Sequence, residues 1–229
     1  VGWLWLATEC DAQLPLTPRV SLFLFALGVA PVLFTPLVYA LYETNTGDNM
    51  EMFTNMMKVG GSLAAVPIGL ATAYAMGNRG YPDPSKRPLF AALVCSMVLF
   101  AVGGGISLMI KDSNTIITAH YHGTGGAVSL AFMGLAFVLL PRLGFRAPDL
   151  KLAFWQPYVY GGGQLLHIIG LLWSGGYGVQ RKVAGAAQEL HSFGQVAGMG
   201  LMGIGGLIAV IGGLMFLVIV FRAMRGRTR

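Results

Sequence analysis

The chain has 229 residues, of which 55% are hydrophobic and only 10% are charged. Ordinary soluble domains carry about 25% charged residues. This composition, with a mean hydropathy of +0.67, excludes a typical soluble domain and indicates that lipid surrounds most of the chain. We attribute the net charge of +6 to basic residues that set the membrane topology, and we do not take it as evidence for nucleic-acid binding.

The first residues form neither a clear signal peptide nor a spanning helix. They lack a basic start, and Glu9 and Asp11 follow the apolar run Trp3–Leu6. We therefore predict an N-terminal interfacial segment over residues 1–18, followed by a membrane domain over residues 19–229.

Six apolar stretches follow in the chain, each near the ~20 residues that cross a ~30 Å hydrocarbon layer. They lie at about Val20–Tyr42, Thr54–Gly77, Pro88–Ile110, Thr115–Leu140, Leu152–Trp173 and Phe193–Phe221. Lipid offers no partners to backbone groups, and these stretches lack the alternation of a barrel strand. The expected fold class is all-α: a polytopic membrane bundle of about six transmembrane helices.

Basic residues are distributed unequally between the two sides of these helices. Eleven of the fifteen Lys and Arg fall on one side: Arg19, Arg79, Lys86, Arg87, Arg142, Arg146, Lys151, Arg222, Arg225, Arg227 and Arg229. Loops on the other side carry Lys111, Arg181 and Lys182. By the positive-inside rule, we expect both termini of this integral membrane protein to be cytoplasmic.

All four histidines lie in the second half of the chain: His120, His122, His167 and His191. His120 and His122 lie about one and a half turns into the fourth predicted helix and point about 200° apart. A single metal ion prefers ligands three or four residues apart, so this pair suits two sites on opposite faces of one helix. Neutral imidazole is a good axial ligand for haem iron.

Each histidine also has a purely structural interpretation. A histidine inside a helix bundle can simply hydrogen-bond a backbone carbonyl or a hydroxyl group. We expect that structural role for His167, which is in mid-helix, and interfacial solvation for His191. Arg181 and Lys182 could neutralise the carboxylates of a cofactor or be ordinary loop charges.

These residues resemble a known family, subunit I of the haem–copper respiratory oxidases. Asn114–Thr115, then Ala119–His122, then a Gly-, Ala- and Phe-rich helix ending at Leu140–Gly144 resembles that family's tenth helix. Other elements resemble its eighth, ninth and eleventh helices, the last with a basic pair: Val66–Gly69, Val102–Gly105, His167–Leu171 and Gln180–Lys182. The six helices would then be the seventh to twelfth of a twelve-helix subunit.

The resemblance implies a role for each matching residue. His120 would be the proximal ligand of a high-spin haem iron, and His122 an axial ligand of a low-spin haem iron, of b or a type. Arg181 and Lys182 would hold haem propionates, with lysine replacing the second arginine that is usual in the family.

The chain also departs from the family. The family's copper histidines have no counterpart here, because the matching part of the first helix reads Tyr39–Glu43 and contains no histidine. Glu43 stands where a copper ligand is expected, so a carboxylate-liganded non-haem iron is a further alternative. Ala71 lies near the position of the usual proton-pathway lysine. Copper is expected only if a partner chain supplies its ligands.

Three functions remain open. The first is a haem-binding subunit of an oxidase-like complex, which reduces oxygen or nitric oxide with other membrane subunits and receives electrons from cytochrome c or quinol. The second is a membrane haem subunit for electron transfer alone. The third is a non-haem structural or transport bundle. The family resemblance favours a bacterial inner membrane as the location.

Overall fold

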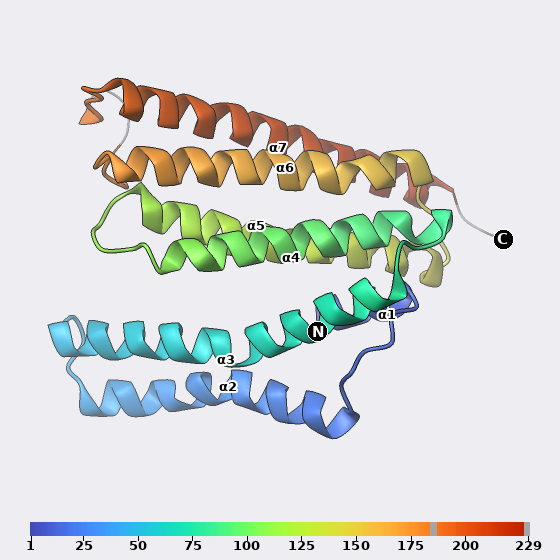
Figure 1. Ribbon diagram of the computed structural model, residues 1–229, viewed down its shortest axis with the longest axis horizontal. Helices are drawn as coiled ribbons and strands as arrows, with labels where there is room; N and C mark the ends of the chain where they lie inside the picture. Colours follow the sequence, from blue (N-terminus) through green and yellow to red (C-terminus); the bar gives the residue numbers. More distant parts are fainter. Residues whose placement is uncertain (184–186, 227–229) are drawn as a thin grey trace. The chain divides into compact units, whose positions relative to one another are not determined.

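The structure, a computed structural model, describes residues 1–183 and 187–226. Its elements are α1 (Gly2–Glu9), α2 (Pro18–Leu41), α3 (Gly47–Arg79), the 3-10 turn η1 (Pro84–Lys86), α4 (Arg87–Ser107), α5 (Thr115–Arg142), α6 (Leu150–Gly176) and α7 (Phe193–Arg225) (Figure 1). In the described ranges no strand forms, and one isolated bridge joins Asn114 to Gln180. Arg227 and Arg229 of the predicted basic tail lie outside the described residues.

The prediction of an all-α membrane helical bundle is confirmed. Each of the six predicted spans corresponds to one long helix, and the predicted start of α5 at Thr115 is the observed one. Among the described residues, five helical segments are long and apolar enough to cross a membrane: Pro18–Leu41, Gly47–Arg79, Pro84–Ser107, Thr115–Arg142 and Phe193–Arg225. The 27 residues of α6 are also sufficient in length. However, α6 carries Gln156, Gln164 and His167, so its membrane crossing stays a prediction.

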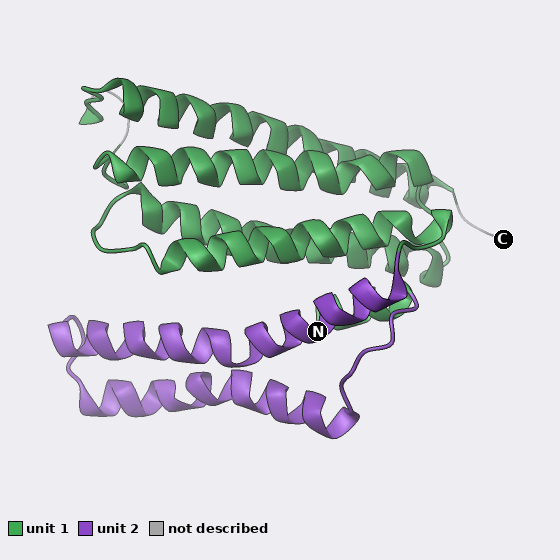
Figure 2. Ribbon diagram, viewed as in Figure 1, with its two compact units in different colours: residues 1–10, 81–229 green, residues 11–80 purple. Residues whose placement is uncertain are grey.

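The helices group into two compact units (Figure 2). Unit 1 comprises residues 1–10 and 81–229, and therefore contains α1 and α4 to α7. Unit 2 comprises residues 11–80 and contains α2 and α3. The division predicted at residues 18 and 19 stays a prediction.

Unit 2 is a pair of helices with prolines in their interiors. Pro31 and Pro36 lie within α2, and Pro67 lies within α3. A side chain at Gly60 of α3 would overlap the Pro31 ring, so this glycine leaves room for that ring between the two helices. Much of the remaining surface of α2 is apolar and exposed, as expected for helices that face lipid.

The long helices of unit 1 lie side by side and pack through glycine (Figure 1). A Cβ atom at Gly103 of α4 would be 2.8 Å from the Cα of Gly123 on α5. At the α6–α7 interface, a Cβ atom at Gly163 would overlap the backbone of Ala209. Small residues allow helix backbones to approach closely in membranes, and this packing accounts for these glycines.

The short helix α1 packs on α4 and α5. Leu6 is fully buried, and the Trp3 indole donates a 2.9 Å hydrogen bond to the Ser96 hydroxyl of α4. Glu9 forms a 2.6 Å ion pair with Arg142 at the end of α5. The sequence analysis did not predict this helix. Its eight residues are too few to show apolar side chains recurring at the helical spacing, which is the pattern that predicts a helix.

Candidate functional site

The start of α5 is fixed by two sets of hydrogen bonds. The Asn114 side chain accepts a 3.0 Å bond from the Ile116 N–H and so caps the helix. The Thr115 hydroxyl donates a 2.8 Å bond to the Leu171 carbonyl of α6 and lies 3.1 Å from the Ser174 hydroxyl. The two histidines that follow therefore project from a helix that is anchored at its beginning.

His120 faces α4. Its Nδ1 lies 2.8 Å from the Gly103 carbonyl oxygen, and its side chain is half-buried. A carbonyl oxygen can only accept, so Nδ1 is the donor, and in a neutral imidazole Nε2 then carries the lone pair. Histidines that bind metal through one nitrogen commonly donate from the other to a backbone carbonyl, so this arrangement suits a ligand. The same bond also satisfies a purely structural histidine.

His122 lies on the other side of α5, against α6. Its ring centroid is 4.6 Å from that of His167, with an angle of 64° between the rings. The residue is exposed. The structure thus places His120 and His122 against two different helices, as their spacing predicts.

The surface of α5 beside His122 is open. A Cβ atom at Gly125, three residues further on, would meet no atom within 4 Å. Residues three apart share a helix face, so this bare backbone adjoins His122. Tyr121 and Phe132 are 58% and 65% exposed on the same helix. An exposed imidazole beside open backbone is the kind of surface that a flat prosthetic group such as haem could contact.

Arg181 and Lys182 lie at the end of the bundle where α5 begins. The Thr115 N–H donates a 3.0 Å bond to the Val179 carbonyl, and Gln180 pairs with Asn114. The Arg181 Nε donates a 3.0 Å bond to the Ser113 hydroxyl. His120 follows Thr115 by five residues, which is about 7.5 Å along the helix axis. The basic pair and the two histidines therefore belong to the same end of unit 1.

The remaining histidines occupy different surroundings. His191 is exposed and lies 3.2 Å from a Glu189 carboxylate oxygen, at the start of α7. His167 is half-buried, with its Nδ1 2.9 Å from the Met202 carbonyl oxygen of α7. The sequence analysis missed its contact with His122, because the relative register of two helices leaves no signal in the spacing within either one. In the described part of the chain, no group of three or more His, Cys, Asp or Glu could hold a metal ion.

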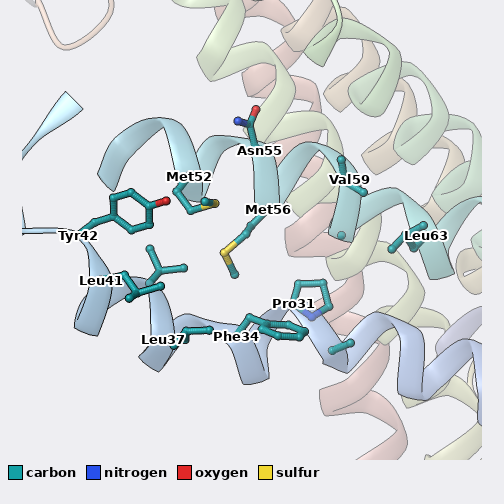
Figure 3. A pocket seen from close by; sticks show the side chains of 13 residues that line it. Pro31, Phe34, Leu37, Leu41, Tyr42, Met52, Asn55, Met56, Val59 and Leu63 are labelled. Atoms are coloured by element: carbon teal, nitrogen blue, oxygen red, sulfur yellow. The ribbon is translucent and has the colours of Figure 1, made fainter. Parts of the chain in front are cut away.

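A groove lies within unit 2, between α2 and α3 (Figure 3). This groove has a volume of about 470 Å³, and nearly all the side chains that line it are apolar. Figure 3 shows the Met56 side chain between the two helices and the Asn55 amide pointing away from α2. The lining contains no histidine, cysteine or charged side chain, so we do not assign redox or acid–base chemistry to the groove.

No protein-family model matches the chain. Over 143 aligned residues, which cover 58% of this chain, it is 38% identical to an uncharacterized protein of Rickettsia prowazekii (strain Madrid E). The match covers 28% of that protein, so the chain spans little more than a quarter of the length of this relative.

Proposed function

We propose that the chain is a haem-binding membrane subunit of a complex similar to the haem–copper oxidases. In this complex, electrons pass through haem toward the reduction of oxygen or nitric oxide, and a partner chain completes the reaction centre. His120 would bind a high-spin haem iron and His122 a low-spin haem iron. Arg181 and Lys182 would neutralise haem propionates.

One observation carries this proposal. His120 and His122 project from a single anchored helix toward two different helices, α4 and α6. Two haems bound in this way would be separated by little more than the width of α5, which gives electrons a short path. A pair of histidines on the same face would not support two haems.

The chain's own residues bind and orient the cofactor. Haem, when bound, supplies one-electron redox chemistry at its iron. The Gly103 carbonyl fixes the tautomer of His120 and directs the Nε2 lone pair away from α4. The Arg181 guanidinium, already oriented by Ser113, retains N–H groups that can bind a carboxylate.

The partner chain is part of the proposal. No histidine precedes His120, so the copper ligands of the family have no counterpart among the residues of this chain. The relative from Rickettsia is longer than the region it shares with this chain. The missing copper ligands also favour a second candidate function, that of a membrane haem subunit that only transfers electrons.

The distribution of charge supports an orientation in the membrane, which we propose to be a bacterial inner membrane. The Arg146 N–H donates bonds to the carbonyls of Ala223 and Gly226, at 3.3 and 2.8 Å. These bonds join the basic α5–α6 loop to the end of α7, whereas Arg181 and Lys182 lie at the other end of unit 1. The more basic end would be cytoplasmic by the positive-inside rule.

Reduced-minus-oxidised absorbance spectra of the purified complex test the proposal. We expect wild-type protein to show low-spin and high-spin haem bands. His122→Ala should lose the low-spin band and His120→Ala the high-spin band. His191→Ala, on the exposed histidine outside the site, should match wild type. A wild-type spectrum without haem bands would refute the proposal, and haem without any copper in the complete complex would favour the electron-transfer candidate.

A further inference from the structure

The contact between His122 and His167 joins a candidate haem ligand to a histidine of the neighbouring helix. The two ring centroids are 4.6 Å apart and the ring planes meet at 64°. Aromatic rings attract one another in such edge-to-face arrangements, at centroid separations of about 4.5–7 Å. On the side that faces α6, the His122 ring therefore packs against the His167 ring.

The His167 ring is itself held in place. Its Nδ1 lies 2.9 Å from the Met202 carbonyl oxygen of α7, so Nδ1 is the protonated nitrogen. A Cβ atom at Gly206 would be 3.2 Å from the same Nδ1, so the ring lies directly against α7 at a glycine. A side chain at Gly205 would overlap the backbone of His167. The close packing of α6 on α7 thus fixes the position of this imidazole.

His122 has less support of its own. It is exposed, and the backbone at Gly125 beside it is open. An exposed side chain samples several rotamers, and ordering one of them on binding costs conformational entropy. A fixed ring against one side of His122 reduces that freedom before any ligand arrives. It also restricts the angle at which the imidazole plane can meet a haem.

We propose that His167 is a positioning residue for His122: carried by α6 and tied to α7, it sets the orientation of the imidazole that binds the low-spin haem. This role rests on the proposed haem function of His122. The supporting groups around a metal ligand fix its orientation and tune the metal, although they do not touch the metal themselves. A His167 that served only to join α6 to α7 would have no effect on the haem signal.

Two substitutions separate these roles. His167→Asn retains a side-chain N–H close to the position of Nδ1, and so retains the bond to Met202, but it removes the ring beside His122. His167→Phe retains a ring beside His122 and loses the bond. The readouts are haem content, the electron paramagnetic resonance spectrum of the low-spin haem and its midpoint potential, all measured on the complete complex. His191→Asn is the control.

We expect His167→Asn to keep the haem content of wild type within about twofold while it shifts or broadens the low-spin resonance and moves the midpoint potential. His167→Phe should change both less. A low-spin resonance and a potential in His167→Asn that equal those of His191→Asn would overturn the positioning role. A spectral change in His167→Phe alone would also overturn it, because that result assigns the effect to the bond with α7.

A measurement that needs no haem distinguishes failure of this role from failure of the proposed function. In protein labelled at histidine, solid-state nuclear magnetic resonance should show a cross-peak between the His122 and His167 rings, and the peak should be absent in His167→Asn. Absence of the peak in wild type would overturn the inference whether or not haem is bound. A peak in a protein that never contains haem would overturn the proposed function and the positioning role together, leaving only the packed pair.

Discussion

The two faces of α5 differ in how tightly the rest of unit 1 packs around the histidine that each face carries. On the α4 side, Gly103 and Gly123 bring the helix backbones together, and the His120 ring is hydrogen-bonded and half-buried. On the other side, His122 is exposed beside the open backbone of Gly125. The His120 ring is thus held by a hydrogen bond within unit 1, whereas the His122 ring is exposed beside open backbone. One helix therefore combines a packed interface with an exposed surface.

The largest effect should come from adding a methyl group to the packed face of α5. In Gly123→Ala, the new Cβ would be 2.6 Å from the Cα of Gly103. Because backbone atoms cannot move aside cheaply, we expect the free energy of unfolding to fall by about 1–3 kcal/mol. Gly125→Ala is the matched control on the open face, and its free energy of unfolding should stay within about 0.5 kcal/mol of wild type.

Denaturing-detergent titrations of the two alanine variants, followed by circular dichroism, make the comparison. Equal losses of stability in the two variants would show that the face beside Gly125 is packed as tightly as the α4 side. Tolerance of Gly123→Ala would show that α4 and α5 do not approach at these glycines.

A smaller effect is expected where α5 begins, because both faces depend on that anchor. Thr115→Val keeps the shape of the side chain but removes its bonds to Leu171 and Ser174 of α6. We expect a loss of about 1 kcal/mol in the free energy of unfolding. Ser129→Ala is the control, because that hydroxyl bonds only to the Gly125 carbonyl of its own helix. A Thr115→Val protein as stable as the control would show that these bonds do not anchor the start of α5.

The two histidines themselves should differ in haem-free protein. His120→Ala loses the bond to Gly103, and side-chain hydrogen bonds between membrane helices contribute about 0.6 kcal/mol on average. His122→Ala loses a ring contact at an exposed position, so its free energy of unfolding should change by less than about 0.5 kcal/mol. Detergent titration of both variants would check this order. The reverse order would show that His122 is the better packed of the two.

The sequence predicted most of the fold because few backbone structures are possible in lipid. Apolar stretches of spanning length must be helices, and the loops between them are marked by charge, Gly and Pro, so every long helix was located. The helix α3 begins before the predicted apolar stretch, because the Thr46 side chain caps a polar first turn that precedes it. The helix α1 was missed because its stability comes from burial of Leu6 on other helices, and no local pattern records that burial.

Part of the candidate site was also predictable. The spacing of His120 and His122 determines that they project from opposite sides of one helix, since that geometry is local. The contact of His122 with His167 was not predictable, because it depends on how far α6 is shifted along α5. The bond between Arg181 and Ser113 likewise depends on a pairing of two loops that are distant in sequence.

The smallest changes in stability are expected from substitutions of the basic pair, Arg181 and Lys182. Their effect on haem dissociation tests whether the open face of α5 binds an anionic cofactor. Arg181 is half-buried and tied to Ser113, whereas Lys182 is exposed. Arg181→Ala and Lys182→Ala should each leave the free energy of unfolding within about 0.5 kcal/mol of wild type, as is usual for surface substitutions. If these cations hold propionates, haem should nevertheless dissociate faster from both variants, and faster from Arg181→Ala because its guanidinium is already oriented. The rate of haem transfer to an acceptor protein measures this loss. Unchanged rates in both variants would identify the pair as ordinary loop charges, and the open face of α5 would then have no cationic partner for a haem.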